Sequence, residues 1–175
     1  MNTLITSMIV QSQAQALLKF PFVNLYNDVD DILASLCQKT LNISTGPPYH
    51  KILYAFRIAR NDFRGAASIL YERLQRLQTT SSKIHDPEDE SLTQSYLMLI
   101  NTLASVQPDQ AWILAEKRVD ENAITWGIGK AKGILKRRVV TLEDLRKEYQ
   151  AELDRVSAME NGQFAFTGGD EMDVL

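Results

Sequence analysis

The sequence has 175 residues, of which 45% are hydrophobic and 23% are charged. This length and apolar content suit one globular unit, or one cooperative part of a larger protein, and exclude a chain that is disordered throughout. The 19 basic and 22 acidic residues give a formal net charge of -3, so the overall field favours neither nucleic acid nor an anionic membrane. The single cysteine excludes an internal disulfide and a paired-cysteine metal site.

Glycine and proline are scarce in this sequence. Together they make up about 7% of the chain, against an average near 12%. Few turn-forming residues favour long helices over many short strands, so the predicted fold class is all-α. Residues 1–10 are apolar but lack a basic start, and polar residues interrupt them, so we expect neither a secretory signal nor membrane insertion.

Apolar residues recur at helical spacing along most of the chain. Proline and polar clusters interrupt the spacing at Pro21, at 42–48 and at 79–90, and these breaks separate the predicted helices. We expect about seven helices, stacked as irregular hairpins. In chain order, they are expected at residues 1–20, 24–41, 49–60, 63–77, 91–106, 109–115 and about 142–156.

One pair of predicted helices is joined with almost no loop. Asn61 and Asp62 end the helix that starts at Tyr49 and cap the next one, so the two helices must be antiparallel. The small residues Ala66 and Ala67 allow close approach of the two backbones. This hairpin is tetratricopeptide-like, although one hairpin does not define a repeat period.

The later helices carry distinct patterns. Apolar residues cover most of the circumference of 91–106, which predicts a central, buried helix. Trp112 is expected in the core, on the short helix that follows Pro108. Thr141 to Asp144 resembles a capping box at the start of the last helix, where Glu143 and Lys147 form a favourable pair.

The expected organisation is a single α-helical solenoid segment over 1–175. Residues 116–140 lose the helical period, contain three glycines and end in a basic run, so they are interpreted as a long excursion, extended near its end. Residues 161–175 are expected to form a loop and the start of a truncated helix, which predicts that the chain is a fragment of a longer protein.

Catalysis has few candidates in this sequence. Cys37 and His50 lie on different predicted helices, and a Cys/His dyad is an alternative, but no flanking motif activates the thiol. The acidic cluster 85–90 lacks the spacing of a metal site, and the glycines of 127–133 match neither a dinucleotide loop nor a Walker loop. We therefore expect no catalytic residue, no cofactor and no bound metal.

Surface contacts are the expected mode of action. Trp126, in the glycine-containing excursion, and the basic residues Lys136, Arg137 and Arg138 are the candidate partner contacts. An RNA-binding role for the stretch from Lys130 to Arg138 is a further alternative, but no aromatic pattern of an RNA-binding domain accompanies the charges. A basic edge that docks on an acidic partner is the preferred interpretation.

Three blocks of the sequence resemble the nucleoporin 120/160 family, scaffold subunits of the Y-shaped complex of the nuclear pore. They read YHKILYAFRIARNDFRGAASILYERL (49–74), SYLMLINTL with AWIL (95–103 and 111–114), and VTLEDLRKEY (140–149). The blocks follow the family's order and spacing. No counterpart of the family's N-terminal β-propeller is present, so the resemblance implies a piece of the C-terminal α-helical region.

The resemblance implies a non-enzymatic role. A helical solenoid segment of this family would help to build the coat of the nuclear pore complex at the nuclear envelope and support nucleocytoplasmic transport and messenger RNA export. The implied partners are nucleoporin 85 and nucleoporin 145C, the latter called nucleoporin 96 in animals. The alternative is a helical-repeat binding module of another multisubunit assembly, which would share the 49–77 hairpin but not the later blocks.

Overall fold

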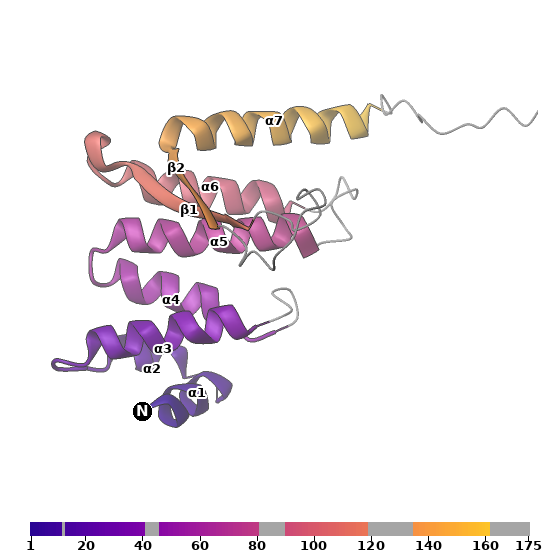
Figure 1. The fold of residues 1–175 in the computed structure, drawn as a ribbon. Helices are drawn as coiled ribbons and strands as arrows, with labels where there is room; N and C mark the ends of the chain where they lie inside the picture. The colour runs from indigo at the N-terminus through magenta and orange to yellow at the C-terminus, as the bar shows by residue number, and fades with distance from the viewer. Residues whose placement is uncertain (12, 41–45, 81–89, 119–134, 162–175) are drawn as a thin grey trace, which may run out of the picture.

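The computed structural model describes residues 1–11, 13–40, 46–80, 90–118 and 135–161. The described residues form seven α-helices, one short 3-10 helix and one two-stranded sheet (Figure 1). The α-helices are α1 Asn2–Val10, α2 Ala14–Lys19, α3 Tyr26–Lys39, α4 Tyr49–Ile58, α5 Phe63–Thr80, α6 Ser91–Ala104 and α7 Leu142–Glu160. The 3-10 helix η2 covers Pro108–Gln110, and the strands are β1 Trp112–Arg118 and β2 Leu135–Thr141.

The helices form a stack in which each of α3 to α7 lies beside the next (Figure 1). The helix α3 contacts α4, α4 contacts α5, α5 contacts α6, and α6 contacts α7. The two short helices α1 and α2 lie at the N-terminal end of the stack. The predicted helical class and the stacking of neighbouring hairpins are confirmed. The β1–β2 ribbon, an addition to the predicted helices, lies against α5.

The hairpin of α4 and α5 follows the predicted break at Asn61 and Asp62. Asn61 has a backbone φ of 61°, a left-handed conformation that asparagine tolerates better than most residues. The Asp62 carboxylate accepts a hydrogen bond of 2.9 Å from the Gly65 N–H and so caps α5. Ala66 and Ala67 are fully buried, as the close approach of the two helices requires.

Two apolar cores lie side by side along the stack. Tyr54 on α4 packs against both of them, and α5 contributes residues to each, so α5 is their common wall. The N-terminal core consists of Ile5, Ile9, Leu17, Phe22, Val29, Leu33, Cys37, Tyr49, Ile52, Leu53, Phe56 and Ile69. The C-terminal core consists of Ala67, Leu70, Tyr71, Leu74, Leu77, Leu92, Tyr96, Leu99, Leu103, Ala111, Ile113, Ala115, Val140 and Leu145.

The predicted helix at 109–115 is wrong. Only the single 3-10 turn η2 follows Pro108, and β1 begins at Trp112 and pairs antiparallel with β2. Pairing with β2 satisfies the backbone of this segment, and Ile113 and Ala115 alternate toward the core as a strand requires. Trp112 is half-buried outside the core, with the Arg64 guanidinium 3.9 Å above its ring.

Helix α6 is only partly the central helix that its apolar residues predict. Leu99 and Leu103 are fully buried, whereas Leu97 and Met98 are 43% and 40% exposed. One side of α6 therefore faces solvent.

The predicted capping box at the start of α7 is confirmed. The Asp144 N–H donates to the Thr141 hydroxyl, and the Thr141 N–H donates to the Asp144 carboxylate.

Candidate protein-binding surfaces

The alternative of a catalytic Cys37 and His50 dyad is not supported by the state of the two side chains. Cys37 is fully buried, and burial raises the pKa of its thiol to about 12. His50 is also buried, and this burial, followed by the charges of Arg76 and Arg73, lowers the pKa of its imidazole to about 4. A thiolate–imidazolium pair needs the opposite shifts, so these two groups stay neutral at pH 7. In the part of the chain that the structure describes, buried His50 Nε2 has no hydrogen-bond partner.

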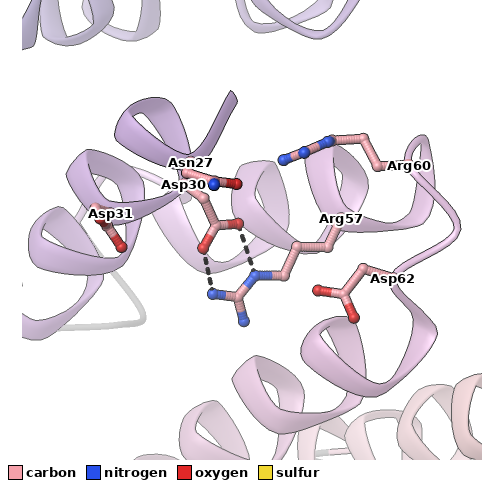
Figure 2. Close-up of a pocket in the computed structure, with 6 residues that line it drawn as sticks. All are labelled: Asn27, Asp30, Asp31, Arg57, Arg60 and Asp62. Carbon is pink, nitrogen blue, oxygen red and sulfur yellow. Dashed lines mark hydrogen bonds and ion pairs between the residues drawn. The ribbon is translucent and has the colours of Figure 1, made fainter. Parts of the chain in front are cut away.

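A charged hollow of about 260 Å³ lies where α3 meets the α4–α5 turn (Figure 2). Arg57 Nε and Nη2 donate to the two carboxylate oxygens of Asp30 at 2.9 and 2.7 Å, and Nη1 donates to the Gly65 carbonyl at 2.7 Å. This bidentate bond to Asp30 raises the pKa of Arg57. Each of the three guanidinium nitrogens donates within the fold, so Arg57 joins α3, α4 and α5.

An aromatic groove of about 420 Å³ adjoins this hollow. Phe20, Tyr26 and Phe56 line it with Arg60, whose guanidinium lies 4.5 Å from the Tyr26 ring centre and 5.4 Å from that of Phe56. Arg60 lines both the hollow and the groove. Tyrosine, phenylalanine and arginine are residues enriched at protein interfaces, so this groove is a candidate contact surface.

The β1–β2 ribbon forms the second candidate surface. Ile113 and Val140 face the core, whereas Leu114 and Val139, which are directly opposite in the register, are 48% and 52% exposed. Arg137 and Arg138 are exposed on β2. The Arg138 guanidinium lies 3.8 Å from the Glu148 carboxylate on α7, a long and half-exposed ion pair of low stabilising value.

The structure places the predicted contact residues unevenly. Arg137 and Arg138 lie on β2, and Lys136 belongs to the same strand by its backbone. Trp126 and most of the glycine-containing excursion lie outside the described residues, as do 81–89 and 162–175. Sequence reasoning missed the exposed pair Leu114 and Val139. The sequence held no signal for this pair, because the buried neighbours Ile113 and Val140 are apolar too and the register decides which residues face outward.

No group of three or more histidine, cysteine, aspartate or glutamate side chains among the described residues is placed to hold a metal ion. Across the same residues, no helix has both the length and the apolar content needed to cross a membrane.

Comparison with known proteins decides the family. The family model described as NUP160/120 middle TPR matches residues 1–104, which is the stack from α1 to the end of α6. The chain belongs to the NUP160/120 family. This membership confirms the resemblance of the sequence blocks. The matching NUP160/120 model describes the middle of the family's proteins, and the expected C-terminal placement stays a prediction.

Curated NUP160/120 relatives align over most of this chain. Nucleoporin NUP120 of Chaetomium thermophilum is 31% identical over 98% of this chain and 20% of its own length. Nuclear pore complex protein Nup160 of Mus musculus is 30% identical over 85% of the chain and 11% of its own length. Nucleoporin nup120 of Schizosaccharomyces pombe is 28% identical over 84% of the chain and 12% of its own length. The chain thus spans a fifth or less of the relatives it matches.

Proposed function

We propose that this chain is a non-enzymatic, structural segment of a scaffold subunit of the nuclear pore complex at the nuclear envelope. The observation that carries the proposal is the family match, which coincides with a continuous helical stack over α1 to α6. Stacked helices offer extended surfaces for neighbouring proteins. Through such contacts the segment supports nucleocytoplasmic transport and messenger RNA export.

The proposed partners are other subunits of the Y-shaped complex, in particular nucleoporin 85 and nucleoporin 145C/96. The proposed contact residues are Trp126 with Lys136, Arg137 and Arg138. The exposure of Arg137 and Arg138 on β2 supports this assignment, and so does the apolar pair Leu114 and Val139 beside them. A mixed apolar and cationic surface is typical of protein interfaces.

Sizing chromatography with light scattering tests the proposal. The 175-residue chain is mixed with the helical domains of nucleoporin 85 and nucleoporin 145C, and the masses of the eluting species are measured. We expect a stoichiometric complex, weakened by Arg137→Glu with Arg138→Glu and unchanged by the matched pair Lys51→Glu with Lys39→Glu. Both control lysines are exposed, on α3 and α4.

Failure of a helical, monodisperse chain to form this complex would contradict the proposed partners. A second measurement separates the alternative, a helical-repeat module of another assembly. A fluorescent fusion of the parent protein should mark the nuclear rim in cells. A diffuse signal or one at another organelle would contradict the proposed location and favour the alternative.

A further inference from the structure

Strand β2 has one edge that faces away from β1. The Leu142 N–H donates to the Ala111 carbonyl at 3.2 Å, and these residues are direct partners when the β1–β2 register is extended by one pair. In an antiparallel ladder, directly bonded pairs alternate with unbonded pairs. The N–H and C=O groups of Ile113 and Val140 therefore point into the ribbon. Those of Leu114 and Val139 point outward, at its two opposite edges.

Val139 lies on the outward edge of β2 and is exposed. Its side chain is 52% exposed and lies beside exposed Leu114 on the outer face of the ribbon. In the part of the chain that the structure describes, the sheet has only the strands β1 and β2. An accessible strand edge is a template for pairing with another extended chain.

The basic residues around this edge favour an acidic partner segment. The two strands hold five basic residues and one acidic residue, Glu116, which is opposite Arg137 in the register. Three of the basic residues are consecutive on β2, and Arg137 and Arg138 are exposed there. A partner segment that carries carboxylates is therefore attracted to this strand. Nothing on β2 itself supplies a negative charge.

We propose that the outward edge of β2 binds an extended, acidic segment of a partner protein by β-strand addition. The added strand hydrogen-bonds to the backbone of Val139, extends the apolar pair of Leu114 and Val139 with an apolar side chain beside Val139, and directs its carboxylates at Arg137 and Arg138. The apolar pair and the open backbone favour a peptide over nucleic acid, which would use the charges alone. This inference rests on the proposed function in protein contacts and specifies the kind of partner segment that is bound.

Proline substitutions test the two edges of the ribbon separately. Because the Val139 N–H points outward, Val139→Pro removes no hydrogen bond of the ribbon but blocks strand addition at β2. Leu114→Pro is the matched control, since it blocks the opposite edge on β1 in the same way. Both variants are first checked for unchanged helical circular dichroism and an unchanged unfolding midpoint relative to the parent chain.

The probe is a fluorescently labelled peptide of three Glu-Glu-Val repeats, measured by anisotropy with the 175-residue chain. We expect saturable binding that weakens with added salt, a loss of at least about tenfold in Val139→Pro and a change of less than about twofold in Leu114→Pro. A second peptide has the same side chains but an N-methyl group on every residue. It keeps the charge and lacks the amide donors at both of its edges, so its affinity should fall by a similar factor with the unaltered protein.

Equal binding of the N-methylated peptide would overturn strand addition, and this readout does not depend on any variant folding. A loss in Leu114→Pro with none in Val139→Pro would overturn the assignment to β2. Binding of a mixed-sequence RNA oligonucleotide without binding of the peptide would overturn a protein partner. Co-elution with nucleoporins that survives Val139→Pro would overturn strand addition and leave the proposed function standing. Peptide binding without co-elution would support strand addition and contradict the proposed nucleoporin partners.

Discussion

Single arginine side chains join helices that are distant in the sequence. Arg57 on α4 bonds to Asp30 on α3 and to the Gly65 carbonyl on α5. Arg76 on α5 donates to the carbonyls of Cys37 and Thr40 at 2.8 and 3.1 Å. These carbonyls lie at the C-terminal end of α3, where positive charge is favoured. The two guanidinium groups thereby fix α3 against the α4–α5 hairpin.

Arg57→Ala should lower the free energy of unfolding by about 2–3 kcal/mol, because it leaves the half-buried Asp30 carboxylate without its cation. Arg57→Lys should lose about half as much, since it retains the charge but not the bidentate geometry. Urea unfolding monitored by circular dichroism measures both. The control Lys51→Ala, exposed on the same helix, should stay within about 0.5 kcal/mol of the parent chain. If Arg57→Ala lowers the free energy of unfolding by less than about 0.5 kcal/mol, Arg57 does not stabilise the packing of α3 on the α4–α5 hairpin.

His50 makes stability depend on pH. The pKa of its imidazole is about 4 in the folded chain and near 6.5 when unfolded, so the unfolded state binds more protons between these values. The stability that neutral His50 contributes is therefore present above pH 6.5 and is lost as pH falls toward 4. We expect a loss of about 2 kcal/mol between pH 7.5 and 5, measured by urea unfolding. In His50→Phe this slope should flatten, and an unchanged slope would assign it to other groups.

At the scale of the element, the start of α5 depends on Gly65. A Cβ atom at this position would overlap the Asp62 carboxylate that caps the helix. Alanine is normally favoured over glycine in a helix by up to about 1 kcal/mol, but here Gly65→Ala should give no gain because it displaces the cap. In the Asp62→Ala background the gain should return. A double-mutant cycle by thermal unfolding measures the coupling, and equal effects in both backgrounds would rule it out.

Local signals in the sequence predicted helix ends better than the ribbon. The capping box of Thr141 and Asp144 and the break at Asn61 depend on residues within a few positions of each other, so the sequence alone located them. The strand that begins at Trp112 depends on pairing with β2, which lies more than 15 residues further along the chain. Proline at 108 indicated a helix start, and tertiary pairing overrode it.

The candidate surface was predictable only in part for the same reason. The charges of Arg137 and Arg138 are visible in the sequence, but their apolar neighbour Leu114 is placed beside Val139 by the register alone. Likewise, the apolar residues of α6 do not reveal which neighbours cover them. Leu97 and Met98 were therefore expected to be buried and are exposed.

Across the whole molecule, the two cores make stability a local property. Each stacked element contacts mainly its neighbours, so damage at one end should not reach the other. Ile5→Ala, in the N-terminal core, should speed amide hydrogen exchange in α1 and α2 and leave α6 and α7 unchanged. Leu74→Ala, in the C-terminal core on the shared helix α5, should speed exchange from α5 to α7.

Mass spectrometry of the exchanging amides locates these changes. Leu4→Ala is the matched control for Ile5→Ala, because Leu4 lies on the same helix and is 56% exposed. Its exchange should match that of the parent chain in every segment. Uniform acceleration over α1 to α7 in Ile5→Ala would instead indicate one cooperative unit.

The hydrogen bond between Leu142 and Ala111 closes the ribbon at its base. The chain therefore leaves the helical stack and rejoins it at one point, and α7 begins beside the place where the stack was interrupted (Figure 1). Residues can be gained or lost between the two strands without changing where α7 begins. The ribbon is thus a site at which related chains can diverge in length and in binding preference while the helical support beneath it is inherited unchanged.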